Sequence, residues 1–295
     1  MVINEYCKAC QIRRNLNKYP ATASPDEIAE YQQGVRTIIA HCDGLSTPQI
    51  SEKMIALRRE FFGPAKDFTA IKQHFNRLML NLLPYMQQQV ADADDALRMA
   101  VQFSMVGNYI DFGILEEVDD QELRMKLDAA KDIAIAPEML QSFRREVEMA
   151  RRLVLFTDNC GEIVTDRLLL SVLRNINPHL FVTVIVRGKP VVNDATMEDA
   201  RQIGIDDVAQ RVIGNGAGMP GNVIGAISSE AMDEIRKADV LVSKGQGNYE
   251  GLSGCGLNIF YLFLCKCDAF MQRFHVPQFT GVMTREVFHD NVAGA

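Results

Sequence analysis

Three polar clusters in the second half of the sequence, at residues 157–162, 187–194 and 243–250, contain the residue types that bind metals and anions. Within them, Asp158, Asn159 and Asp194 offer only oxygen atoms as ligands. Hard and borderline divalent cations prefer such ligands, and they keep open positions for water and a substrate oxygen. We therefore predict that these three residues bind a divalent metal and form the catalytic centre.

The same clusters contain groups that suit a phosphate. Asp158 and Asn159 stand where a helix should begin, and the free amides and dipole of a helix start favour an anion. Lys244 and the backbone amides of residues 245–248 would hold further phosphate oxygens. A metal would neutralise the phosphate charge and lower the pKa of a bound water. The nucleophile that attacks phosphorus would be either this water or Asp158 itself. We favour water, but the sequence does not decide between them.

Each cluster also has an ordinary interpretation. Asp158 and Asp194 are placed where a helix N-cap or a turn residue would stand, and Lys244 with Gly245 is a common way to leave a strand. A mechanism that needs a second Asp two positions after Asp158 is disfavoured, because Cys160 stands there. The metal-site hypothesis depends on the three clusters occurring together, each after a predicted strand.

Apolar runs directly before the clusters predict the strands that would position them. Clear runs cover 153–156, 180–186 and 239–243, a weak one covers 211–213, and 257–264 fits a strand or a buried helix. Helical segments at 162–175, 197–203 and 229–238 lie between these runs. Strands that alternate with helices predict a doubly wound, mostly parallel sheet, whose ligands bind beyond the carboxyl ends of the strands.

The first half of the chain is predicted to be helical. Helices are expected over 25–42, with Ser24 as N-cap, and over 47–62, 67–83, 93–106, 121–134 and 137–150, with Pro84 ending the third of them. The predicted fold is therefore α/β with two domains. Residues 1–150 form a helical domain, and residues 151–295 form an α/β domain that binds metal and substrate.

Composition limits the partners. The chain has 295 residues, 47% of them hydrophobic, and its net charge of −7 offers no basic face for nucleic acid. The most apolar stretch, 257–267, is too short to cross a bilayer, and we expect neither a leader peptide nor membrane binding. Seven cysteines, several within apolar runs, suit reduced thiols in the cytoplasm. A homo-oligomer stays open.

Five segments together resemble the DUF89 family of metal-dependent damage-control phosphatases. They are 156–162, 192–196, 243–250, Gly107–Gly113 and the Cys7-x-x-Cys10 pair, which is similar to that of a prokaryotic subgroup. The resemblance implies a helical domain packed on a Rossmann-like sheet domain, and small phosphometabolites such as sugar phosphates as substrates. It also implies cobalt, nickel, manganese or magnesium as the divalent metal.

The resemblance assigns roles to individual residues as well. Asp158, Asn159 and Asp194 match the metal ligands of the family. The residues that match its substrate-binding positions are Glu162, Lys244, Gly245, Gly247, Asn248 and, more loosely, Lys266.

Two other functions are kept as alternatives. A methyltransferase using a methyl-sulfonium cofactor would have a glycine-rich loop after its first strand, but residues 158–161 contain one glycine. A non-catalytic module that binds a metabolite would retain metal-dependent binding without turnover. Both alternatives predict no release of inorganic phosphate.

Several further residues have open assignments. Cys7 and Cys10 form half of a zinc site, which His41 and Cys42 would complete only by folding back, so a plain pair at a helix start is favoured over a metal or redox role. Asn108, three positions before Asp111, is interpreted as a cap with a slight preference over a site residue. Asp166 and Asp199 are predicted to be surface charges on helices.

Overall fold

A six-stranded sheet forms the centre of the computed structural model, which describes residues 1–109 and 120–286. The strand order is β3-β2-β1-β4-β5-β6, in which the first five strands are parallel and β6 is antiparallel to β5. Chain direction across the sheet switches between β1 and β4, and this is where ligands bind in such folds. The strands are β1 Arg152–Phe156, β2 Phe181–Val186, β3 Arg211–Gly214, β4 Val240–Lys244, β5 Ile259–Leu264 and β6 Gly281–Glu286.

Helices account for most of the rest of the described chain. They are α1 Glu5–Asn15, α2 Pro25–Ala40, α3 Thr47–Phe62, α4 Thr69–Asp92, α5 Ala96–Gly107, α6 Asp120–Asp128, α7 Pro137–Met149, α8 Glu162–Ile176, α9 Met197–Gln202, α10 Ser229–Lys237, α11 Gln246–Leu252 and α12 Asp268–Phe274, with short 3-10 turns at Ala129–Asp132 and Ile205–Asp207. Among these described helices, none is both long enough and apolar enough to cross a membrane.

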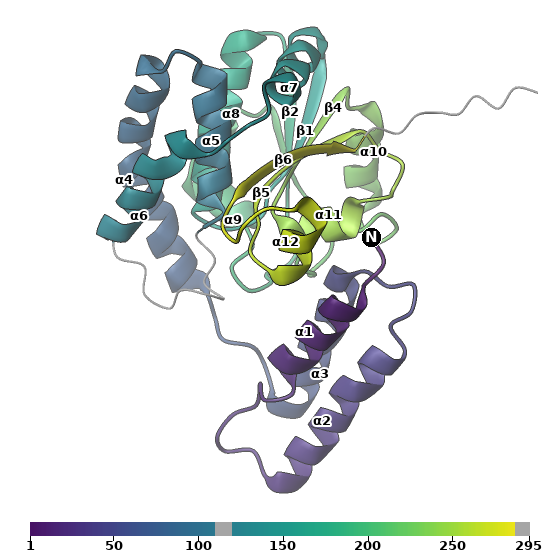
Figure 1. The fold of residues 1–295 in the computed structure, drawn as a ribbon. Helices are drawn as coiled ribbons and strands as arrows, with labels where there is room; N and C mark the ends of the chain where they lie inside the picture. The colour runs from purple at the N-terminus through teal and green to yellow at the C-terminus, as the bar shows by residue number, and fades with distance from the viewer. Residues whose placement is uncertain (110–119, 287–295) are drawn as a thin grey trace, which may run out of the picture.

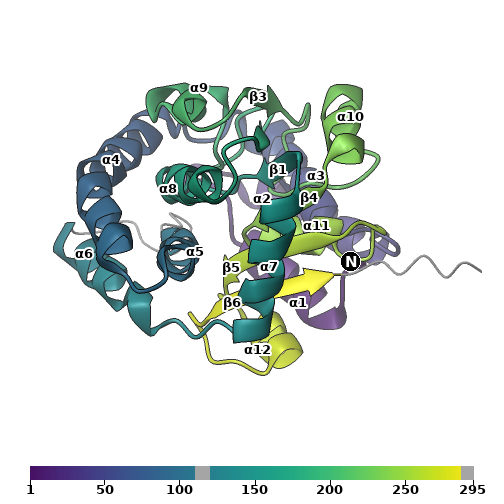
Figure 2. The same cartoon turned by 90° about the horizontal axis from the view of Figure 1, so that it is seen from above.

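Alternating strand residues bury both faces of the sheet. Leu153 and Leu155 of β1 pack in one core with residues of α4, α5, α7 and α8. Val154 and Phe156 of the same strand pack in a second core with residues of α10, α11 and α12. Figure 2 shows α5 and α8 on one side of the strands and α10 on the other. This is the predicted doubly wound α/β fold, with helices covering the sheet on both sides.

The helices α1, α2 and α3 form a bundle of their own, which lies beside α11 and α12 rather than along the sheet (Figure 1). Their core includes Cys7, Tyr31, Val35, Ile50 and Met54. In contrast, α4, α5 and α7 share the core of the sheet. The predicted division into domains at residue 150 stays a prediction.

One predicted helix end is wrong. Helix α4 was expected to stop before Pro84, but it continues to Asp92 with Pro84 inside. A proline removes one helical hydrogen bond. Burial of Phe75, Leu83 and Met86 in the sheet core extends on both sides of Pro84, so packing keeps the helix continuous.

Candidate active site

The loops after β1 and β2 lie directly against each other. Asn159 and Asp194 form an antiparallel bridge, Cys160 N donates to Asn193 O at 2.9 Å, and Ala195 N donates to Asp158 O at 2.7 Å. These backbone bonds hold the two loops at the carboxyl edge of the sheet. The three predicted metal ligands, Asp158, Asn159 and Asp194, are therefore brought together.

A buried arginine that sequence reasoning did not assign joins the two carboxylates. Arg187 follows β2 and has a fully buried side chain. Its Nε donates to Asp194 Oδ2 at 2.5 Å, its Nη2 lies 3.4 Å from Asp158 Oδ1, and its Nη1 donates to Asn248 Oδ1 at 3.1 Å. The only signal in the sequence is a charged residue at the end of an apolar run.

Two side-chain amides hold the carboxylates from the other side. Asn108 Nδ2 donates to Asp158 Oδ2 at 3.0 Å and to Glu162 Oε2 at 2.8 Å. Asn159 Nδ2 donates to the same two oxygens, at 2.9 Å each. Asn108 occupies the C-cap position of α5, yet its side chain points into the site, so the preferred cap interpretation was incomplete. Asp111, its proposed companion, lies outside the described residues.

Lys244 is buried beneath the cluster rather than beside a cavity. Its Nζ lies 2.6 Å from Glu162 Oε1, 2.9 Å from Asp166 Oδ1 and 2.7 Å from Ser104 O. An ammonium group has three protons to donate, and these partners use all of them. The direct contact with phosphate that we predicted for Lys244 is therefore not available in this structure, where the residue instead positions Glu162.

The prediction that Asp166 and Asp199 are surface charges is wrong. Asp166 is fully buried beside Lys244, and burial raises its pKa to about 6 although Lys244 opposes the shift. Asp199 is also buried and pairs with Lys72 at 2.6 Å. Helical periodicity did not identify them because α8 and α9 are covered on more than one side.

The glycine-rich turn after β4 is shaped by the carboxylate that it contacts. Gly245 has φ of +79°, and a Cβ there would lie 1.9 Å from Asp158 Oδ2, so only glycine fits. Asn248 Nδ2 donates to Thr157 O and Lys244 O at 3.0 and 2.7 Å. These bonds tie the loop after β1 to the start of α11.

A cavity of about 310 Å³ lies over this cluster. Five of the predicted site residues line it: Asp158, Asn159, Asp194, Gly247 and Lys266. The other four do not line it: Glu162 and Gly245 contact residues that do, whereas Lys244 and Asn248 bond to Glu162 and Arg187 behind them. The far wall is formed by α1, the segment after it and α3, through residues that sequence reasoning did not assign to the site, including Gln11, Arg14, Lys18, Ser51 and Ile55.

Asp158, Asn159 and Asp194 form the floor of the cavity, and the charges there suit a cation. Burial, together with the charges of Glu162 and Asp194, raises the pKa of Asp158 to about 8, while Arg187 and Lys266 oppose this. Burial disfavours the charged form of Glu162 too, but the attraction of Lys244 outweighs it and lowers the pKa. Negative charge thus exceeds what the buried cations compensate.

The donor set fits a divalent metal through its chemistry. Asp158, Asn159 and Asp194 supply carboxylate and amide oxygens at one cavity wall, which is the set that magnesium-like cations take. Within residues 1–109 and 120–286, no three His, Cys, Asp or Glu side chains are grouped as a metal site. A metal here would therefore depend on the Asn159 amide, and Cys7 with Cys10 gain no support as metal ligands.

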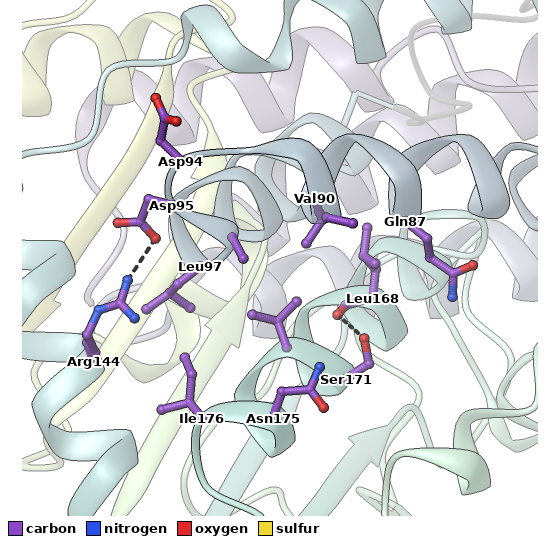
Figure 3. Close-up of a pocket in the computed structure, with 13 residues that line it drawn as sticks. Gln87, Val90, Asp94, Asp95, Leu97, Arg144, Leu168, Ser171, Asn175 and Ile176 are labelled. Carbon is purple, nitrogen blue, oxygen red and sulfur yellow. Dashed lines mark hydrogen bonds and ion pairs between the residues drawn. The ribbon is translucent and has the colours of Figure 1, made fainter.

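A second, larger cavity lies away from the site. It has about 640 Å³ and is lined by Val90, Asp95, Leu97, Arg144 and Ile176, among others (Figure 3). Arg144 Nη2 already pairs with Asp95 Oδ1 at 2.7 Å. Because α8 starts at the carboxyl edge and ends at Ile176, this cavity is at the opposite edge of the sheet and contains no predicted site residue.

Known proteins are similar to this chain in architecture and in sequence. The family model of the damage-control phosphatase ARMT1-like domain matches residues 3–282. A damage-control phosphatase of Archaeoglobus fulgidus is 32% identical over 211 residues, which cover 71% of this chain and 72% of that protein. Another, from Pyrococcus horikoshii, is 34% identical over 193 residues, covering 64% and 65%. A crystal structure of a DUF89 family protein from Pyrococcus horikoshii matches with a TM-score of 0.81 and 25% identity, over 97% of this chain and 99% of that one.

Proposed function

We propose that this chain, which belongs to the damage-control phosphatase family with an ARMT1-like domain, hydrolyses small phosphate esters. In this proposal a divalent metal is held by Asp158, Asn159 and Asp194. The resemblance and the phosphatase activity are confirmed by the family match and the named relatives. The metal, its ligands and the choice of sugar phosphates as substrates remain our proposal.

One observation supports the proposal most strongly. Two carboxylates and an amide from the ends of neighbouring strands line a cavity of about 310 Å³, together with Lys266 and Gly247. Small-molecule sites begin at about this size. A metal bound there would neutralise phosphate charge and polarise the phosphorus–oxygen bond. Lys266 and the amide of Gly247 would bind the remaining phosphate oxygens.

The surrounding residues have positioning roles in this proposal. Arg187 and Asn108 hold the two oxygens of Asp158 in place, at 3.4 and 3.0 Å. Lys244 favours the ionised form of Glu162, which in turn accepts bonds from Asn108 and Asn159. Helices α1 and α3 cover the cavity from above and reduce its contact with bulk water.

The test is a screen for inorganic phosphate released from a panel of sugar phosphates and other small phosphate esters. The protein is first treated with a chelator, and magnesium, manganese, cobalt or nickel is then added back one at a time. We expect no turnover after chelation and recovery with at least one metal. Full turnover in the chelated protein would overturn the metal, and metal-dependent binding without turnover would favour the binding-module alternative.

The same screen separates the phosphatase from the methyltransferase alternative, because release of phosphate requires no methyl donor. The absence of nucleic-acid and membrane partners, the cytoplasmic location and the oligomeric state stay predictions. Each needs a separate measurement on the whole chain.

A further inference from the structure

Three basic side chains stand together on the helical side of the cavity. Arg14 is in the last turn of α1, Lys18 follows that helix, and Arg58 is in α3. Arg58 Nε donates to Lys18 O at 3.1 Å, which links the two segments. The Arg14 guanidinium and the Lys18 ammonium form no hydrogen bond or ion pair with any residue that the structure describes. We name Arg14, Lys18 and Arg58 the basic cluster.

The basic cluster lies where two cavities meet. Arg14 and Lys18 line the cavity above Asp158 and Asp194. Lys18 and Arg58 line a neighbouring cavity of about 440 Å³ between α3, the start of α4 and the loop after β2. Lys18, Ile55 and Val192 line both, so the two cavities adjoin at this point.

The carboxylates nearby are largely committed to other partners. Asp158 and Asp194 pair with Arg187 on the floor of the first cavity. In the second, Asp199 pairs with Lys72 and Asp67 accepts a hydrogen bond from Thr69 N.

Two further carboxylates line these cavities. Glu198 is in the first turn of α9, where the helix dipole stabilises its charge. Burial raises the pKa of Glu250 to about 7, which reduces its charge near neutral pH. The second cavity is nevertheless lined, within the described part of the chain, by five basic residues and three acidic ones, so positive charge exceeds negative charge around the basic cluster.

The pKa of Lys18 agrees with this excess of positive charge. Burial, followed by the charges of Arg14 and Arg58, lowers the pKa of the Lys18 amine. Like charges held close together at a cavity wall repel one another, and a bound anion would remove that repulsion. Guanidinium and ammonium groups form their strongest hydrogen bonds with carboxylate and phosphate oxygens.

We propose that Arg14, Lys18 and Arg58 bind a second anionic group of the substrate, at the end away from the phosphate that is hydrolysed. This inference rests on the proposed function and narrows its substrate class. The preferred substrates are phosphate esters with a carboxylate or a second phosphate at their other end. The reacting phosphate lies against the floor residues, and the middle of the molecule passes Ile55 and Val192.

The experiment compares two pairs of substrates that differ in the distal anion. The first pair is 3-phosphoglycerate and glycerol 3-phosphate, and the second is fructose 1,6-bisphosphate and fructose 1-phosphate. The metal-loaded parent should prefer the doubly anionic member of at least one pair in kcat/KM. In Lys18→Gln and Arg58→Gln, this preference should fall about tenfold, through a higher KM for the doubly anionic ester.

Matched controls are Arg13→Gln on α1 and Lys53→Gln on α3, two exposed positions that line neither cavity. Both should retain the preference of the parent, and Lys18→Arg should restore it. Thermal unfolding of every variant checks that the fold is intact. A parent without any preference, or folded Lys18→Gln and Arg58→Gln variants that keep it, would overturn the inference.

Failure of the proposed phosphatase function would give a different result. In that case the parent would release no phosphate from any ester, whatever its distal group. Calorimetry with phosphonate analogues of the same pairs would then still test whether the basic cluster binds the distal anion. Equal dissociation constants for both members of each pair in the parent would overturn it.

Discussion

The floor and the roof of the cavity are built on opposite principles. On the floor, Asp158 and Asp194 are held at strand ends with Glu162 beneath them, and Arg187, Lys244 and two amides bond to these carboxylates. On the roof, which is formed by α1, the segment after it and α3, the charged ends of Arg14 and Lys18 form no hydrogen bond or ion pair with the described residues. The two regions also have separate hydrophobic cores.

This difference assigns different tasks to the two regions. A reaction centre needs side chains fixed to within a fraction of an ångström, and a sheet edge with many hydrogen bonds supplies that rigidity. Discrimination between substrates needs groups whose charges are satisfied by the ligand, because the lost contact then penalises the wrong substrate.

The largest effect is expected from Lys244→Ala. The substitution would leave Glu162 and Asp166 buried without their shared cation. Breaking a buried ion pair from one side costs about 3–5 kcal/mol of unfolding free energy. Urea unfolding of the parent and the variant measures this loss.

Lys237→Ala is the matched control for Lys244. Lys237 is 55% exposed and lies 3.3 Å from Glu234, which is also paired with Arg211. Its loss should change the unfolding free energy by no more than about 0.5 kcal/mol. Equal effects of the two variants would mean that the buried network under the floor has no special role in stability.

The second effect is expected from Asp194→Asn. An asparagine can still accept the hydrogen bond of Arg187, but it removes one negative charge from the metal ligands. Since a metal contributes several kcal/mol to phosphoryl chemistry, kcat/KM at limiting metal should fall by about 100-fold or more. Metal titration of phosphate release gives the affinity.

Asp233→Asn, a change of the same kind at an exposed position of α10, is the control for Asp194. Its kcat/KM and metal affinity should equal those of the parent. If Asp194→Asn also behaved like the parent at limiting metal, Asp194 would not be a ligand.

The floor could be predicted from the sequence because strand, turn and polar cluster follow each other directly. Asp158 comes two residues after β1, and Asp194 follows β2 within one short loop. Once the sheet is inferred as parallel, its carboxyl edge brings them together. The apolar runs marked β1, β2 and β4 well, and 257–264 proved to be β5.

The residues of the roof, and the residues that position the floor carboxylates, could not be predicted in this way. Asn108 reaches Asp158 because α5 packs against α8, a contact between residues 50 apart that periodicity does not reveal. Arg14 and Lys18 lie over the site because the first helices fold back onto α11. For α1 only a helix start at Cys7 and Cys10 was predicted, without bounds, and strand β6 was not predicted, since both have weak apolar patterns.

The third prediction concerns Glu250, which is on α11 at the contact between the two regions. Burial raises its pKa to about 7 from an ordinary value of 4.5. Between these values the folded protein binds more protons than the unfolded chain, so its stability falls as the pH rises. Glu250→Gln removes that titration. The melting temperature of the variant, relative to the parent, should therefore rise between pH 4.5 and 7 and stay constant above.

Glu60→Gln, at an exposed position of α3, is the control for Glu250. Its melting temperature relative to the parent should not depend on pH in this range. A flat difference for Glu250→Gln as well would show that this carboxyl group is not held in its neutral form.

The smallest effect on the chemistry is expected from replacing Cys7 and Cys10 together by serine. Cys7 is buried in the core of α1, α2 and α3, and its Sγ lies 3.9 Å from Glu250 Oε1. Burial raises the pKa of the Cys7 thiol to about 12. A thiol that stays protonated is a poor nucleophile and a poor metal ligand.

The double variant should therefore keep kcat within a few-fold of the parent, while its unfolding free energy falls by about 1 kcal/mol as a hydroxyl enters the apolar core. Phosphate release with saturating metal and urea unfolding measure the two quantities. Cys10 and Cys267 line a cavity of about 580 Å³ with Cys7, so zinc content is measured in the same samples. Loss of stoichiometric zinc would favour a structural metal site between α1 and the loop after β5. Complete loss of turnover in a folded, metal-loaded double variant would mean that the helical bundle contributes to the chemistry itself, and the separation between floor and roof would fail.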